Sequence, residues 1–384
     1  MDVPNPRGLT LASLFPKEIV WRDRQPWLKE QEYMLRPRFR KDWIPSWDDP
    51  SNFNPRTEDS EVNTHRNLID ATHIPTGRVV MLKCILKSRH PHEVEIARFF
   101  STEPIASHPR NHCYPVLDVL EPPEEPDVVI LVTPLLRPFN NPLMESVGEA
   151  VEFFRQVFEV SHMHSSLPLS PHDRSFQGLQ FMHQCQVAHR DCMDLNIMMD
   201  PRDMFPQGYH PTAIIFDPQR KGAAPFFTRT VSRPKYYLID FGLSRMYDPK
   251  DGEPKEDIIF GGDKSVPEFQ GSLEPLNPFP TDIYYLGNMI RMSFLLDSSA
   301  LSFMKPLVDE MVQDDPSKRP TIDVVVQRFD EIVQQLSWWK LRSHLPNSER
   351  FGPEHWSLGR RISYCFRAAA SILSGQSAIP RPRL

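Results

Sequence analysis

Two short stretches of this 384-residue chain contain residue types that can do acid–base and metal chemistry. The first runs from His189 to Asn196 and places an Asp five positions before the Asn. The second, Asp240-Phe241-Gly242, ends an apolar run. A carboxylate can take a proton from a hydroxyl, and carboxylate and amide oxygens are ligands that Mg²⁺ accepts. These residue types could therefore activate a hydroxyl beside a bound cation.

In their order and spacing, the two stretches resemble the catalytic loop and the magnesium loop of the protein kinases. The resemblance implies that Asp191 accepts or orients the proton of the attacking hydroxyl, and that Asn196 and Asp240 hold the metal ions that bridge the phosphates. It also implies structural roles for the neighbouring motif residues, which are His189, Arg190, Phe241 and Gly242. The alternative is a solvated charge cluster and an unrelated Asp-Phe-Gly turn, because a motif needs structural context.

The upstream chain predicts a β-hairpin and a helix. Residues 67–71 and 79–84 read as strands around the turn at 74–77, and residues 92–100 show helical spacing. Lys83 lies where the kinase resemblance places the lysine that holds the α- and β-phosphates. Glu95 would pair with Lys83, and Glu93 is the alternative partner. The competing interpretation is an ordinary strand lysine and a solvated helix face.

Two further apolar runs, 114–120 and 128–132, predict strands that lead into the segment 133–136. The resemblance makes this segment the hinge between two lobes, where backbone groups bond the adenine ring, and it assigns Leu136 to the nucleotide site. Residues 197–200 read as a short strand, and Met198 would lie beneath the adenine.

Later motifs continue in kinase order. Val266-Pro267-Glu268 resembles the motif that ends the activation segment. Asp282 begins a predicted helix and would hold the catalytic-loop backbone from below. Arg319, within a late Asp-Pro-x-x-Arg-Pro-Thr motif, would pair with Glu268 and fix the substrate platform. The residues around these motifs, together with residues 109–113 ahead of them, resemble fungal kinase-like proteins that carry one kinase domain. The resemblance covers about two-thirds of the chain.

Three features depart from the kinase pattern. Gly77 is the only glycine between Gly8 and Lys83, so no Gly-rich loop over the phosphates can be assigned. Met81 replaces the usual Ala two residues before the lysine, and Met193 replaces the Lys that Ser/Thr kinases carry after the catalytic Asp. The missing Gly-rich loop and Met81 are the evidence for the alternative of a pseudokinase, which is a nucleotide-binding or scaffolding module on the same fold.

Composition limits the class of protein. A net charge of -6 with mixed signs is not that of a nucleic-acid-coating protein. Five cysteines, without a Cys-x-x-Cys pair, indicate a reducing compartment. Neither a signal peptide nor a membrane span is evident. We therefore expect an intracellular protein, cytoplasmic or nuclear.

The predicted fold class is α+β, a two-lobed protein kinase fold with a small β-rich N-lobe and a larger helical C-lobe. A Pro- and Trp-rich extension (1–60) either packs on the body or stays mobile until a partner binds. The tail contains a possible amphipathic helix, with Leu358, Ile362, Phe366, Ala369 and Leu373 on one face. That helix could bind a membrane surface, pack on the C-lobe or be disordered. The predicted parts are the extension 1–60, the N-lobe 61–136, the C-lobe 137–343 with inserts at 160–177 and 201–235, and the tail 344–384.

The predicted activity is that of a protein kinase that uses ATP and Mg²⁺. It would transfer the γ-phosphoryl group to Ser or Thr hydroxyls of a protein substrate. The insert 160–177, rich in Ser and Pro, would interrupt a helix as an added loop. The basic insert 201–235 could contact an acidic substrate or simply be solvated.

Overall fold

The computed structural model describes residues 14–46, 57–158, 178–259, 262–271, 273–296, 298–346 and 358–382. The chain is mixed α+β, as the sequence predicts, and its backbone divides into two compact units. Unit 1 contains residues 1–94, 115–136 and 201–227. Unit 2 contains residues 95–114, 137–200 and 228–384. Most of the insert that the sequence attaches to the C-lobe, residues 201–227, therefore belongs to unit 1.

Unit 1 is built on a five-stranded antiparallel sheet with the order β1-β2-β3-β5-β4. The predicted hairpin is present as β2 and β3, whereas the strand expected at 114–120 is restricted to three residues. The strands are β1 (Tyr33–Leu35), β2 (Leu68–His73), β3 (Arg78–Leu86), β4 (Asp118–Leu120) and β5 (Val128–Pro134).

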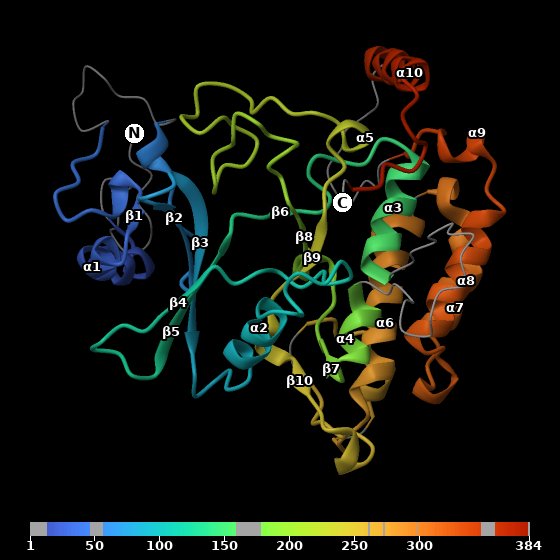
Figure 1. Cartoon of the computed structure of the whole chain (residues 1–384), viewed down its shortest axis with the longest axis horizontal. Coiled ribbons are helices and arrows are strands. Elements are labelled where there is room, and N and C mark those ends of the chain that lie inside the picture. Colours follow the sequence, from blue (N-terminus) through green and yellow to red (C-terminus); the bar gives the residue numbers. More distant parts are fainter. Residues whose placement is uncertain are drawn as a thin grey trace. The chain divides into compact units, whose positions relative to one another are not determined.

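The two faces of this sheet differ because successive side chains of a strand point to opposite sides. One face carries Val80 and Leu82 and packs against the buried Trp21 of α1 (Pro16–Glu30), which lies beside the strands in Figure 1. The other face carries Met81 and Lys83. The extension therefore packs on the body over residues 14–46, which decides between the two alternatives for that part.

Residues 201–227 are attached to the rest of unit 1 by polar contacts, several of which are partly buried. Arg220 donates to Thr57 O and Ser60 Oγ, both at 2.9 Å, and lies 2.6 Å from Glu61 Oε1. Further along the same segment, Thr212 Oγ1 accepts from Arg36 at 3.1 Å. This part of the insert is therefore an ordered layer of unit 1 and not a solvated loop.

Unit 2 is mostly helical. Its core is a cluster of stacked and edge-on phenylalanines that includes Phe153, Phe154, Phe158, Phe294 and Phe329. The helix α2 (Glu93–Ser101) crosses the boundary between the units in the sequence. The other helices are α3 (Val147–Phe158), α4 (Gly178–Gln184), α5 (Arg229–Ser232), α6 (Pro278–Ile290), α7 (Lys305–Met311), α8 (Ile322–Gln334), α9 (Trp338–Leu341) and α10 (Leu358–Leu373).

Short strands position the two motif loops of unit 2. One small antiparallel sheet has the order β6-β8-β9, and a two-stranded ladder joins β7 to β10. The catalytic-loop motif lies between β7 and β8, and the Asp-Phe-Gly motif lies between β9 and β10. These strands are β6 (Arg137–Pro138), β7 (Val187–Ala188), β8 (Ile197–Met199), β9 (Tyr236–Leu238) and β10 (Arg245–Met246).

Two helices flank the predicted insert at 160–177, which itself lies outside the described residues. The end of α3 meets the start of α4 closely, because a Cβ at Gly178 would lie 2.3 Å from Val157 O. Gly178 also has a φ of +58°, which favours glycine. Among the described residues, no helix has both the length and the apolar character that crossing a bilayer requires.

Candidate active site

The catalytic-loop backbone is held by a buried carboxylate from α6. Asp282, which has no exposed surface, accepts from His189 N at 2.8 Å and from Arg190 N at 2.6 Å. Its Oδ2 also lies 3.0 Å from His183 Nε2. These bonds hold Arg190 in the left-handed region at a φ of +67°, a conformation that a non-glycine residue adopts only when its surroundings impose it.

Asp191 and Asn196 are in direct contact. Asn196 Nδ2 donates to Asp191 Oδ2 at 2.8 Å and to the Asp191 carbonyl at 2.9 Å. Asp191 Oδ1 is buried and has no hydrogen-bond partner among the described residues. A Cβ at Gly262 would lie 2.7 Å from this oxygen, so the backbone at residue 262 passes close to it only because that residue is glycine.

The Asp191 carboxyl group lies in an acidic, partly desolvated environment. Burial raises its pKa to about 7, against the opposing hydrogen bond from Asn196. The neighbouring carboxylates of Asp240, Asp282 and Asp263 contribute to the same rise. A carboxyl group with a pKa near 7 exchanges its proton readily around neutral pH, which suits a general base.

Asp240 lies at the end of β9, beside the catalytic loop. Its backbone is left-handed, with φ 65°, and its Oδ1 accepts from Gly242 N at 3.2 Å. Phe241 is fully buried and stacks on Tyr114 with ring centroids 5.0 Å apart. The residue before Asp240 is bonded to the catalytic loop, because Ile239 N donates to Asn196 O at 3.0 Å. The structure thus brings Asp191, Asn196 and Asp240 together within unit 2.

This arrangement fits a divalent cation. Asn196 directs its amide nitrogen to Asp191, which leaves its Oδ1 as a ligand atom, and Asp240 supplies a carboxylate. Burial is the main cause of the raised pKa of Asp191, and the nearby carboxylates of Asp240, Asp282 and Asp263 add a negative charge that a cation would offset. Within the described ranges, there is no group of three or more His, Cys, Asp and Glu side chains suited to a metal ion. A cation would therefore depend on the amide and on oxygens from outside the protein.

Lys83 forms an ion pair with Glu93, the alternative partner named from the sequence. Lys83 Nζ lies 2.5 Å from Glu93 Oε1, and Glu93 is 1% exposed. Glu95 is exposed. The alternative partner named from the sequence is therefore the one that the structure pairs with Lys83. Both glutamates lie in the first turn of α2, and only the direction from which β3 approaches the helix distinguishes them.

The two adenine-contacting residues expected from the sequence lie in different units. In unit 1, the Leu136 carbonyl accepts a long hydrogen bond, 3.4 Å, from Tyr209 Oη. In unit 2, Met198 is half-buried in β8, opposite Pro138 of β6 and Tyr237 of β9. Tyr209 was not identified from the sequence, because no spacing rule connects it to residue 136.

The residues that follow the Asp-Phe-Gly motif are fixed by ion pairs. Arg319 contacts Glu268 through two nitrogens, at 2.7 and 2.6 Å, and Thr281 Oγ1 donates to Glu268 at 2.9 Å. Arg190 lies 3.1 Å from Glu256 and donates to the Asp257 carbonyl at 2.7 Å. These contacts connect the loop at Arg190 to residues 256–257, and Glu268 to the helical body of unit 2.

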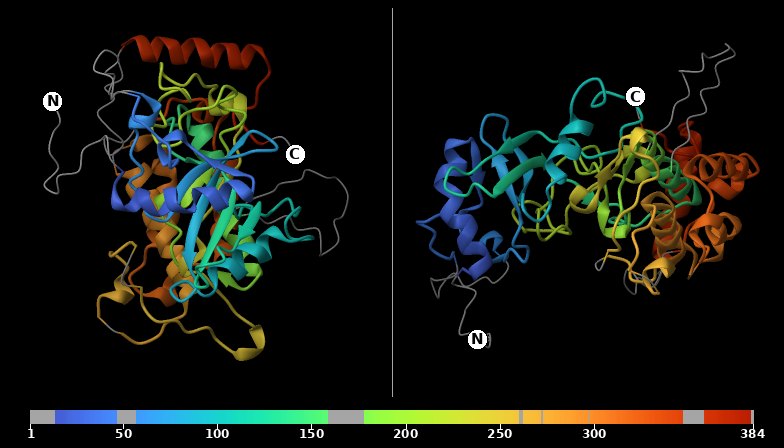
Figure 2. Two further views of the ribbon diagram at one scale, coloured as in Figure 1. Left: turned by 90° about the vertical axis from the view of Figure 1, so that its left-hand side faces the viewer. Right: turned by 90° about the horizontal axis from the view of Figure 1, so that it is seen from below.

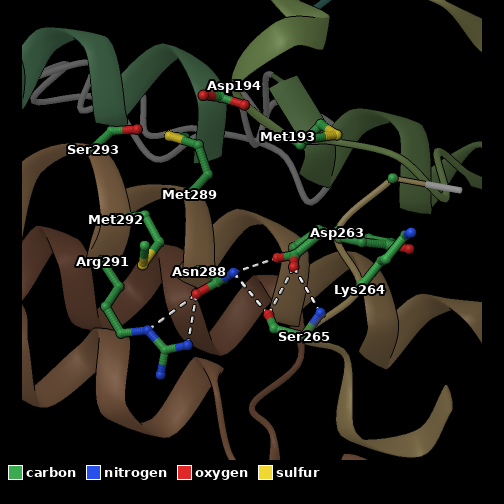
Figure 3. Close-up of a pocket in the computed structure, with 12 residues that line it drawn as sticks. Met193, Asp194, Asp263, Lys264, Ser265, Asn288, Met289, Arg291, Met292 and Ser293 are labelled. Atoms are coloured by element: carbon green, nitrogen blue, oxygen red, sulfur yellow. Dashed lines mark hydrogen bonds between the residues drawn. The ribbon is translucent and has the colours of Figure 1, made fainter. Parts of the chain in front are cut away.

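A cavity of about 310 Å³ in unit 2 adjoins the Asp191 loop. Figure 3 shows Asn288 of α6 pointing at Asp263 and Ser265, with the Arg291 guanidinium on its other side. Asn288 Nδ2 donates to Asp263 and, at 3.1 Å, to Ser265 Oγ. None of these four lining residues was identified from the sequence, although Asp263 and Ser265 lie just before Val266-Pro267-Glu268.

Comparison with known proteins adds no assignment. No protein-family model matches the sequence, and no curated protein matches it.

Proposed function

We propose that this protein is a protein kinase that transfers the γ-phosphoryl group of ATP to a Ser or Thr hydroxyl of a protein. In this proposal the fold is that of a two-lobed protein kinase, with unit 1 as the N-lobe and unit 2 as the C-lobe. The main support is the state of Asp191. One carboxylate oxygen is held by Asn196, and the other is buried, has no described partner and belongs to a group with a pKa of about 7.

In the proposed mechanism, Asp191 Oδ1 accepts the hydroxyl proton of the substrate while Asn196 keeps the carboxylate in position. Such a base contributes about 10²- to 10⁴-fold to the rate. Bound Mg²⁺ would neutralise the charge on the phosphates, and Asn196 Oδ1 and the Asp240 carboxylate would hold it. Lys83, oriented by Glu93, would hold the α- and β-phosphates of the same nucleotide.

A second candidate is a pseudokinase that binds partners without transferring phosphate. Its support comes from unit 1, where a sequence segment between the two motif loops contacts the Leu136 carbonyl through Tyr209. A nucleotide would have to share that carbonyl with the tyrosine. The chain also lacks a Gly-rich loop ahead of Lys83.

The test is a phosphotransfer assay with purified protein, ATP, Mg²⁺ and a mixture of Ser/Thr peptides. A thermal-shift titration with ATP and Mg²⁺ accompanies it. We expect Asp191→Asn to reduce transfer by about 10²-fold or more while the thermal shift persists. We expect Asp240→Asn to reduce both. Asp315→Asn, which changes an exposed carboxylate elsewhere in unit 2, is the matched control.

The two candidates give different results. A thermal shift without transfer in the wild-type protein favours the pseudokinase. Equal transfer by the wild-type protein and the Asp191→Asn variant contradicts the role assigned to Asp191.

A further inference from the structure

Helix α10 presents an apolar face that no described residue covers. Ile362 is 49% exposed, Phe366 73% and Leu373 88%. Ala369 and Cys365, on the same side of the helix, are also exposed. With 3.6 residues per turn, positions 362, 366, 369 and 373 form one continuous stripe. Isolated exposed apolar residues are ordinary, but a contiguous stripe of them indicates a binding surface.

The opposite side of α10 attaches it to the rest of unit 2. Tyr364 Oη donates to the Arg342 carbonyl at 2.8 Å, and Arg342 in turn donates to Ser371 Oγ at 2.7 Å. Arg367 lies 2.6 Å from Glu145. Tyr364, Arg367 and Ser371 follow one another at helical spacing, on the side of α10 opposite the apolar stripe. The polar contacts therefore direct the apolar stripe away from the helical bundle, outside which α10 lies in Figure 2.

The sequence segment that contains α10 is basic. Residues 355–384 contain five arginines, at positions 360, 361, 367, 381 and 383, and no Asp, Glu or Lys. The whole chain, by contrast, has a net charge of -6. Arg367 is paired with Glu145, and the other four arginines leave the segment basic. An apolar stripe within a basic segment is complementary to a surface that is apolar inside and anionic outside.

We propose that α10 binds the surface of an anionic lipid bilayer, with its stripe of Ile362, Phe366, Ala369 and Leu373 in the acyl boundary. A helix of 16 residues is about 24 Å long and would lie in the plane of the interface. A second copy of the chain fits the surface less well, because the arginines of two α10 helices would repel each other. This inference does not depend on the proposed phosphotransfer.

Cys365 provides a probe on the same face of the helix. It is exposed, whereas the other four cysteines are buried or half-buried, so a polarity-sensitive fluorophore labels it preferentially. The labelled full-length protein is mixed with vesicles of phosphatidylcholine alone or of phosphatidylcholine with phosphatidylserine. We expect a blue-shifted emission and co-flotation only with phosphatidylserine, and release as the salt concentration rises. An unlabelled sample tests flotation without the label.

Two sets of substitutions separate the apolar contribution from the charge contribution. Ile362→Asp with Phe366→Asp should lower the vesicle partition coefficient by about tenfold or more, because two apolar side chains that would enter the bilayer become charged. Arg360→Glu with Arg361→Glu should lower it on anionic vesicles. Ile44→Asp, at a residue of unit 1 that is 76% exposed, changes the same chemistry elsewhere and should have no effect. Far-ultraviolet circular dichroism and thermal melting check that each variant is folded.

Three results would overturn the proposal. One is the absence of flotation with phosphatidylserine vesicles. Another is equal flotation of the wild-type protein and the folded Ile362→Asp/Phe366→Asp variant. The third is a concentration-dependent dimer in sedimentation analysis that this variant abolishes, which would show that a second copy covers the stripe.

Discussion

At the level of single residues, the Asp191 carboxyl group is subject to two opposing influences. Burial and the carboxylates of Asp240, Asp282 and Asp263 favour its protonated form, and the Asn196 amide favours its ionised form. The first influence dominates, and the pKa rises to about 7. The folded protein therefore retains a proton on Asp191 at pH values where an unfolded chain has lost it.

This pKa leads to a prediction about stability. A folded-state pKa raised above the unfolded value of about 3.9 contributes stability at low pH, and this contribution is lost as pH rises to about 7. Asp191→Asn lacks the titrating group. We therefore expect the variant to gain stability relative to the wild-type protein between pH 5 and pH 8, by about 2 kcal/mol.

Urea unfolding at both pH values measures this gain. Asp315→Asn is the control, because Ser317 hydrogen bonds lower the pKa of that exposed carboxyl group. A difference between Asp191→Asn and wild type that does not change with pH would show that Asp191 titrates normally.

The Lys83–Glu93 pair supports a second prediction. If Glu93 orients Lys83 toward the phosphates, Glu93→Gln should weaken ATP binding by about tenfold, because a charge-assisted bond becomes a neutral one. Glu95→Gln, two residues along the same helix and exposed, should leave the affinity within about twofold. Isothermal titration with ATP and Mg²⁺ compares the two variants. A larger loss of ATP affinity in Glu95→Gln than in Glu93→Gln would show that Glu95 is the partner that orients Lys83.

At the level of elements, the loops of unit 2 are positioned by side chains from helices distant in sequence. Asp282 of α6 holds the backbone of the loop at Arg190. Arg319, just before α8, holds Glu268. The Arg319 side chain has no exposed surface, and that of Glu268 is 6% exposed. Breaking a pair this deeply buried leaves one charge without compensation.

A double-mutant cycle tests this ion pair. We expect Arg319→Met alone to cost about 3–5 kcal/mol of unfolding free energy, because Glu268 remains buried and charged. The double variant Glu268→Gln/Arg319→Met should recover a large part of that loss. Denaturant unfolding of the four proteins gives the coupling free energy. Additive losses in the double variant would mean that the two side chains act independently.

At the level of the whole molecule, segments far apart in the chain build one unit. Residues 201–227 belong with residues 1–94 and not with their sequence neighbours. Arg220 makes the principal connection, since it contacts three residues between 57 and 61 and its side chain is only 10% exposed.

We therefore expect Arg220→Ala to destabilise unit 1 by about 2–3 kcal/mol, because charge-assisted hydrogen bonds in a partly buried site are lost. Limited proteolysis should then cleave within residues 201–227 earlier than in the wild-type protein. Lys221→Ala, at the exposed next position, serves as the control. Unchanged proteolysis of the Arg220→Ala variant would show that other contacts suffice to hold the segment.

The sequence by itself determined several of the elements, but not α1 or β1. Alternating and helical apolar spacing predicted the β2–β3 hairpin and the helices α2, α3 and α6 within a few residues, because burial of one face imposes that periodicity. The sequence also indicated Asp191, Asn196 and Asp240. The first two are close together in the chain, and Asp240 directly follows an apolar strand. Only the tertiary structure decided which glutamate meets Lys83, that Tyr209 contacts the Leu136 carbonyl, and that residues 201–227 belong to unit 1. Those contacts join residues distant in sequence, and no local pattern encodes the direction from which two packed elements approach each other.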